Sequence, residues 1–229
     1  MKTPAPKKPP PPAPKVRVLL VDDHPIVRQG IRTVVDLEPD LEVCGEADGA
    51  AEALRAVEEF RPDLAVVDLS LKDSSGLELI KDLRIRYPRL LVLVLSMRDE
   101  SFYAERVLRA GARGYVVKDE GCAVVVEAIR KVLKGQIYLS DRIASKMIGS
   151  YVGGARPGTA SMEQLSDREV EVFELLGKGL PSREIAQLLH VSVKTVDSHR
   201  ENIKRKLGIE DATGLLKHAI EWLRRQDDG

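Results

Sequence analysis

The stretch Val16-Arg-Val-Leu-Leu-Val-Asp-Asp23 sets a six-residue, largely apolar run directly before two carboxylates. Further short apolar runs alternate along the chain with segments whose apolar residues follow helical spacing. The runs are Val16–Val21, Leu41–Cys44, Leu64–Val67, Leu90–Leu95 and Tyr115–Val117, and the helical segments are Pro25–Leu37, Ala50–Phe60, Gly76–Arg86, Phe102–Ala110 and Ala123–Leu133. Such strict alternation predicts a doubly wound α/β domain, in which a five-stranded parallel sheet carries helices on both faces.

The pattern changes on either side of this domain, which we expect to span residues 16–134. Seven of the first 15 residues are proline, and this composition is typical of an extended, solvated tail. Residues 135–162 combine a possible short helix at 141–148 with a Gly- and Ser-rich segment, and we interpret them as a linker. From residue 163 to 226 only helical patterns follow, at about 167–176, 182–189, 193–207 and 212–224. The sequence therefore predicts a second, separate all-α domain.

Composition narrows the possible functions. The 36 Lys and Arg residues balance 36 Asp and Glu residues, so the chain is no globally basic nucleic-acid binder, although a local basic patch is possible. The longest apolar run, Leu90–Leu95, is far shorter than the roughly 20 residues that cross a bilayer. Two cysteines give no disulfide framework. We expect a cytoplasmic protein that makes no contact with a membrane.

Four of the five predicted strands are followed directly by polar side chains. In doubly wound sheets, ligands bind beyond the carboxyl ends of the strands, so these side chains should meet at one rim. Three carboxylates stay ionised together only if a cation lies among them, and oxygen ligands suit Mg²⁺. With an ammonium and a hydroxyl beside them, they form a site where an Asp could accept a phosphoryl group. The side chains are Asp22 and Asp23, Asp68, Ser96 and Lys118.

At these positions the chain resembles the receiver domain of response regulators, a flavodoxin-like fold. The matching motifs are Val-Asp-Asp-His at 21–24, Val-Val-Asp-Leu at 66–69, Leu-Ser-Met at 95–97 and Gly-Tyr-Val-Val-Lys-Asp at 114–119. Leu71-Lys72 departs from the family's Met-Pro and could alter the phosphoryl lifetime or the order of that loop. The resemblance implies that Asp68 accepts the phosphoryl group, that Asp23, Asp68 and the Ser70 carbonyl bind Mg²⁺ with Asp22 acting through water, that Ser96 and Tyr115 form the switch pair, and that Lys118 binds the phosphate.

The acidic positions have two other interpretations. A single Asp after a strand is usually a turn or helix cap, but the combination of positions argues against that reading here. A haloacid-dehalogenase-like phosphatase also uses an Asp nucleophile after a strand. That family requires a second Asp two residues later, where this chain has Ser70.

The second domain carries a helix-turn-helix pattern. Ser166 and Glu169 match a capping box at the start of the first helix. Segments 182–189 and 193–207 are joined by a tight turn at His190-Val191, with Ser192 as the next N-cap. At 100° per residue, Val196, Ile203 and Leu207 share one face of the last of these helices. The opposite face is then free to enter a major groove.

The string Val191-Ser-Val-Lys-Thr-Val-Asp-Ser-His-Arg-Glu-Asn-Ile-Lys-Arg-Lys-Leu-Gly208 resembles the LuxR-type DNA-binding domain. Asp197 stands where many relatives carry Lys, and an acid there repels phosphate but could accept from a cytosine amino group. The candidate DNA contacts are Lys194, Thr195, Asp197, Ser198, Glu201, Lys204 and Arg205.

The order of receiver, linker and LuxR-type domain is that of the NarL/FixJ-type response regulators. The resemblance implies a sensor histidine kinase as phosphodonor, control of double-stranded DNA binding by phosphorylation, and a homodimer when phosphorylated. Such a chain takes part in its own phosphoryl transfer but is not a turnover enzyme. The alternatives are a receiver-linked protein-interaction adaptor that binds no DNA and an Asp-based phosphatase.

Overall fold

The computed structural model describes residues 14–227 apart from 72–73, 99, 154–161 and 190. The expected Pro-rich tail up to residue 13, most of the Gly-rich part of the linker and the turn residue His190 lie outside these residues. A five-stranded parallel sheet with the order β2-β1-β3-β6-β7 forms the first domain, so the predicted doubly wound fold is confirmed. Its strands are β1 (Val16–Val21), β2 (Leu41–Ala47), β3 (Leu64–Val67), β6 (Leu91–Ser96) and β7 (Gly114–Val117).

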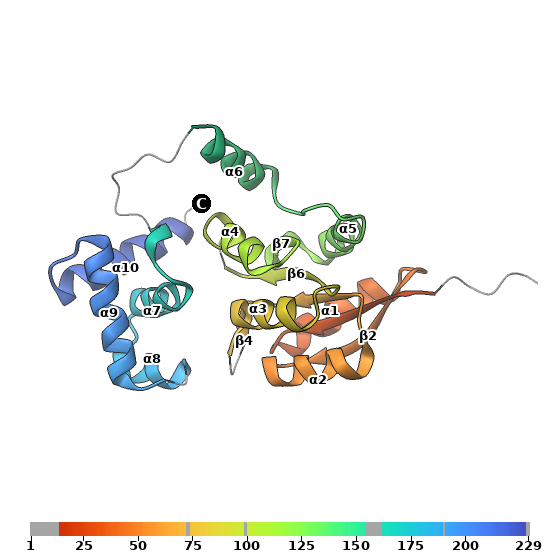
Figure 1. The fold of residues 1–229 in the computed structure, drawn as a ribbon, viewed down its shortest axis with the longest axis horizontal. Coiled ribbons are helices and arrows are strands. Elements are labelled where there is room, and N and C mark those ends of the chain that lie inside the picture. Colours follow the sequence, from red (N-terminus) through yellow and green to blue (C-terminus); the bar gives the residue numbers. More distant parts are fainter. Residues whose placement is uncertain (1–13, 72–73, 99, 154–161, 190, 228–229) are drawn as a thin grey trace, which may run out of the picture.

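Helices cover both faces of this sheet (Figure 1). Successive side chains of a strand point to opposite faces, and because the central strands are largely apolar, both faces carry apolar side chains that the helices bury. Val18 and Leu20 pack on one face with α1 and α5, whereas Leu19 and Val21 pack on the other with α2, α3 and α4. The helices are α1 (Pro25–Asp36), α2 (Ala50–Phe60), α3 (Gly76–Arg86), α4 (Glu100–Ala110) and α5 (Cys122–Leu133).

The loop after β3 forms a small hairpin that the sequence analysis did not predict. Strand β4 (Ser70–Leu71) pairs antiparallel with β5 (Ser74–Ser75). Gly76 then opens α3, and a Cβ atom there would lie 2.1 Å from the Asp68 carbonyl oxygen and 2.6 Å from Leu69 Cα. Only glycine allows the chain to return this closely to the end of β3.

The linker helix is longer than expected. α6 (Asp141–Gly153) continues through Gly149 rather than ending near Ile148. Its start is attached to the first domain, because Ser140 N donates to the buried Glu100 carboxylate at 2.8 Å. The part of the linker up to α6 is therefore bound to the receiver-like domain.

The second domain is helical, as predicted, and comprises α7 (Asp167–Gly177), α8 (Ser182–Leu188), α9 (Val193–Leu207) and α10 (Ala212–Asp227). The expected capping box is present, since Ser166 accepts from Glu169 N and the Glu169 carboxylate accepts from Ser166 N. Single-turn 3-10 helices lie at Lys118–Glu120 and Met162–Gln164. Within the described part of the chain, no helix is long and apolar enough to cross a membrane.

Candidate functional site

The predicted acidic pocket lies at the carboxyl ends of the strands. Asp22 and Asp68 follow β1 and β3 and are 3% and 2% exposed, and Ser96 at the end of β6 is fully buried. Lys118 follows β7, and its Nζ lies 2.6 Å from Asp22 Oδ2 and 2.7 Å from Asp68 Oδ2. The structure thus brings the five predicted side chains to one rim, with the ammonium between two buried carboxylates.

The electrostatics of the pocket follow from this pairing. Burial alone would lower the pKa of Lys118, but the hydrogen bond that Lys118 donates to Asp68 and its charge attraction to Asp22 and Asp68 outweigh burial and raise that pKa. The lysine therefore stays protonated and neutralises part of the acidic charge.

The carboxylates retain capacity for a cation. Asp22, Asp23, His24 and Asp68 each offer a ligand atom, and these atoms lie within 4.8 Å of one another. Asp22 Oδ2 and Asp23 Oδ1 are buried, and neither accepts a well-directed hydrogen bond from any described residue. Asp22 Oδ2 lies within ion-pair distance of Lys118, and Asp23 Oδ1 lies within ion-pair distance of His24. Hard oxygen donors left in this state fit Mg²⁺.

The predicted switch residues are connected through the backbone of Arg98. Ser96 Oγ accepts from Arg98 N at 3.3 Å, and the Tyr115 hydroxyl donates to Arg98 O at 2.7 Å. Tyr115 is 1% exposed, and burial raises the pKa of its phenol. Ser70 N donates to Asp68 Oδ1 at 3.2 Å, so the backbone of Ser70 contacts the predicted acceptor.

The predicted DNA-reading face of α9 is open. Val196 and Ile203 are buried, as the helical periodicity indicated. Lys204 is only 17% exposed at its side chain and pairs with Glu201 at 2.9 Å, and Asp197 accepts from Ser182 Oγ at 3.0 Å. Thr195 is partly buried at the Ser192 cap, and the remaining predicted contacts Lys194, Asp197, Ser198, Glu201 and Arg205 are exposed.

Sequence reasoning missed two residues of the site. His24 Nδ1 lies 2.8 Å from Asp23 Oδ1, and only its position next to the paired acids could have drawn attention to it. Arg98 Nε donates to Ser70 Oγ at 3.0 Å, although nothing in the local pattern distinguishes this arginine from a surface residue.

Comparisons with known proteins show the families to which the two domains belong. Residues 18–130 match the family model described as the response regulator receiver domain, and residues 163–219 match that of bacterial regulatory proteins of the luxR family. The oxygen regulatory protein NreC of Staphylococcus aureus is 34% identical over 211 residues, which cover 90% of this chain and 97% of NreC.

Solved structures resemble the chain over most of its length. RcsB from Salmonella enterica serovar Typhimurium, bound to a promoter in the presence of the phosphomimetic BeF₃⁻, is 27% identical with a TM-score of 0.66, over 90% of this chain and 98% of that one. Another RcsB structure, from Salmonella typhimurium, is 26% identical with a TM-score of 0.70, over 91% and 98% of the two chains. The chain therefore belongs to the NarL/FixJ-type response regulators, which join a receiver domain to a LuxR-type DNA-binding domain.

Proposed function

We propose that Asp68 is the phosphoryl acceptor of this response regulator and that its phosphorylation controls DNA binding by the helical domain. The observation that carries this assignment is the contact of Lys118 Nζ with the carboxylates of both Asp22 and Asp68, at 2.6 and 2.7 Å. A cation beside a buried carboxylate stabilises the negative charge of a phosphoryl group transferred to it.

The proposed transfer uses a phosphohistidine of a sensor kinase as donor. An Asp68 carboxylate oxygen attacks phosphorus, the phosphorus–nitrogen bond breaks, and its electron pair returns to the imidazole. Lys118 and the Ser96 hydroxyl then bind the oxygens of the transferred phosphoryl group. Tyr115 forms the switch pair with Ser96 and changes position with it. Asp23, Asp68 and the Ser70 carbonyl would hold Mg²⁺, with Asp22 acting through water. When bound, the ion balances the charge on the transferring oxygens.

The output is proposed to be sequence-specific binding of double-stranded DNA by a phosphorylated homodimer in the cytoplasm. The receiver spans 16–134 and the DNA-binding domain 163–226 in this proposal. Lys194, Asp197 and Ser198 near the start of α9 read base edges, and Lys204 and Arg205 contact phosphates. The chain transfers and loses its own phosphoryl group but does not turn over a separate substrate.

Labelling by acetyl phosphate with Mg²⁺ tests the acceptor. Asp68→Asn should abolish labelling, because an amide does not replace the carboxylate that accepts the phosphoryl group. Asp23→Ala should slow labelling and weaken Mg²⁺ binding, because it removes a carboxylate of the pocket. Asp119→Asn is the matched control, since Asp119 is exposed one residue beyond Lys118 and should label normally. Wild-type labelling of Asp68→Asn would mean that another residue accepts the phosphoryl group, and steady turnover of a small phosphate ester would favour the phosphatase reading.

A mobility shift on duplex DNA separates the regulator from a protein-binding adaptor. Contacts to phosphates release counterions, so the logarithm of the binding constant should fall linearly with the logarithm of salt concentration. Lys204→Ala or Arg205→Ala should reduce that slope by about one unit without changing the preferred site. A phosphorylated protein that shifts no duplex at low salt would support the adaptor.

A further inference from the structure

A groove of about 1060 Å³ lies at the end of the receiver sheet opposite the acidic pocket. Val16 and Leu91, which line it, are the first residues of β1 and β6, and Asp63 directly precedes β3. The groove therefore opens at the amino ends of the central strands, and most of its lining residues are apolar. Its volume lies at the upper end of the range for sites that bind small molecules, about 300–1,000 Å³.

Rigid rings form part of the lining of this groove. Tyr87, Pro62 and Pro88 all belong to it. The Tyr87 hydroxyl donates to Glu58 Oε1 at 2.9 Å, which restrains the phenol ring. A proline ring loses no side-chain freedom when a ligand covers it, and an aromatic side chain packs well against another aromatic ring. The lining therefore suits a planar aromatic ligand.

The charges that remain available in the groove are positive. Both acids of the lining already accept hydrogen bonds, Asp63 Oδ2 from Arg17 N at 2.8 Å and Glu58 from Tyr87. Arg61 and Arg89 are exposed, and their guanidinium groups make no hydrogen bond or ion pair with any described residue. A guanidinium is a planar set of donors that matches phosphate and carboxylate oxygens.

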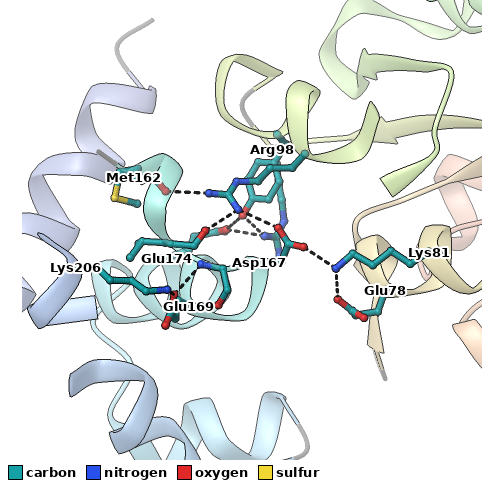
Figure 2. Close-up of polar contacts among 12 residues, drawn as sticks. Glu78, Lys81, Arg98, Met162, Asp167, Glu169, Glu174 and Lys206 are labelled. Carbon is teal, nitrogen blue, oxygen red and sulfur yellow. Dashed lines mark hydrogen bonds and ion pairs between the residues drawn. The ribbon is translucent and has the colours of Figure 1, made fainter. Parts of the chain in front are cut away.

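The helical domain does not supply the missing counter-charge. Arg98 and Lys81 of the receiver pair with Glu174 and Asp167 of α7, both at 2.7 Å, and these contacts dock the helical domain on the receiver (Figure 2). In contrast, no residue of the helical domain lines the groove. An anion for this groove must therefore come from another molecule.

The backbone of Arg61 is a second, independent sign of a ligand site. This residue ends α2 in the left-handed conformation, with φ of 46°, and it is the only described residue other than glycine with a positive φ. Glycine adopts this conformation without strain and is the usual residue at such a helix end. Strained positions of this kind cluster at ligand sites. The chain thus keeps a guanidinium at the groove where glycine would fit the backbone better.

We propose that this groove binds a small planar aromatic anion with the chemistry of a nucleoside monophosphate. The aromatic ring packs against Tyr87 and the two prolines, and the phosphate faces the guanidinium groups of Arg61 and Arg89. The inference is independent of the role of Asp68, because the groove and the acidic pocket lie at opposite ends of the strands.

The chain's own Pro-rich tail is the competing occupant, because it joins the domain at Pro14, which lines the groove. Residues 1–13 contain Lys2, Lys7 and Lys8 and no acid. The groove itself has one more cationic than acidic side chain, and both of its acids already have hydrogen-bond donors. Because like charges repel, the charge of the groove favours an anion over this tail.

Titration of the full ¹⁵N-labelled chain with adenosine monophosphate, without Mg²⁺, tests the proposal by amide chemical shifts. Shifts should appear at Val16, Arg61, Tyr87 and Leu91 rather than at the acidic pocket. Adenosine alone and inorganic phosphate alone should each bind at least about tenfold more weakly, because each keeps only part of the contacts. Equal affinity for either fragment, or shifts confined to another part of the chain, would overturn the proposal.

Two variants assign the binding to the guanidinium groups. Arg61→Gly removes the cation at a position whose backbone glycine accepts, so the fold should be retained. Arg61→Gly and Arg89→Gln should each weaken binding of adenosine monophosphate about fivefold or more, since water screens part of each exposed charge. Arg113→Gln, at an exposed arginine outside the groove that directly precedes β7, should bind as wild type does. Unchanged affinity in both groove variants would contradict the proposal.

A variant of the tail distinguishes the two occupants. Lys7→Glu combined with Lys8→Glu should leave the amide shifts of the groove unchanged in the ligand-free chain, because the proposal places no tail there. Movement of those shifts would show that the tail occupies the groove and would overturn the proposal.

Discussion

At the scale of single residues, Lys118 has two roles that conflict. It neutralises Asp22 and Asp68 at 2.6 and 2.7 Å, yet the same carboxylates are proposed to act in Mg²⁺ binding, directly or through water. An ammonium so close lowers the affinity of the pocket for a second cation while it prepares the pocket for phosphoryl oxygens. The strength of Mg²⁺ binding is therefore a compromise between these roles.

Lys118→Met should tighten Mg²⁺ binding because it removes the competing charge. Two unit charges 4 Å apart interact by about 4 kcal/mol at an effective dielectric constant near 20. Loss of the hydrogen bonds offsets much of this, so we expect an increase on the order of tenfold, about 1.4 kcal/mol. Calorimetric Mg²⁺ titration measures the affinity, with Lys131→Met, an exposed lysine paired with Glu127, as control. Equal affinity in wild type and Lys118→Met would show that Lys118 and the ion do not compete.

At the scale of elements, apolar periodicity predicted the buried strands better than the edge. The bounds of β1 and β3 match their apolar runs, because both strands are central and every residue of β3 is buried. The edge strand β2 continues to Ala47, three residues beyond the predicted end, and Glu46 near its end pairs with Arg28 and Arg32 of α1. An edge strand needs only one apolar face, so its other positions can be polar. The glutamate near the end of β2 therefore makes that part of the strand resemble a loop in sequence.

In the pocket, the residues that follow a strand could be predicted from the sequence, whereas contacts between separate segments could not. The residues after each strand could be placed together because parallel strands end at one rim. The β4–β5 hairpin could not be predicted, since two-residue strands carry no periodicity. His24 was missed because its role depends on contact with Asp23 rather than on a pattern.

The recognition helix α9 makes a prediction at the scale of an element, because its two ends should act differently. Asp197 and Ser198 lie toward the N-terminal end, where this motif reaches base edges, whereas Lys204 lies in the last turn. Asp197→Ala and Ser198→Ala should change the preferred base at one position, with about 1–3 kcal/mol per lost contact. Selection from randomised duplexes measures the preference. If these variants recover the wild-type site while Lys204→Ala changes it, α9 enters the groove in another rotation.

At the scale of the whole molecule, the contact between the domains is a further part of the structure that the sequence could not predict. Arg98 and Glu174 are 76 positions apart, and each looks locally like an ordinary surface charge. Sequence periodicity describes which face of an element is apolar, not which domain covers it. The ion pair between Arg98 and Glu174 therefore depends on tertiary packing that no local pattern encodes.

Phosphorylation should therefore change the affinity for DNA and the mass of the assembly in solution together. We expect phosphorylation to release α7 and α10 from the receiver and to expose surfaces that then pair two chains into a dimer. Phosphodonor should therefore tighten binding to an operator with two half-sites at least several-fold. On a single half-site the gain should be smaller, because most of the predicted reading face of α9 is already exposed in the docked state, so that only dimer formation would add to the affinity. Sedimentation and operator titration with and without acetyl phosphate measure both quantities. If the protein has equal DNA affinity and equal mass with and without phosphodonor, it is a phosphorylation-independent regulator. If phosphodonor raises the affinity equally on operators with one and with two half-sites, the effect lies in α9 rather than in dimer formation.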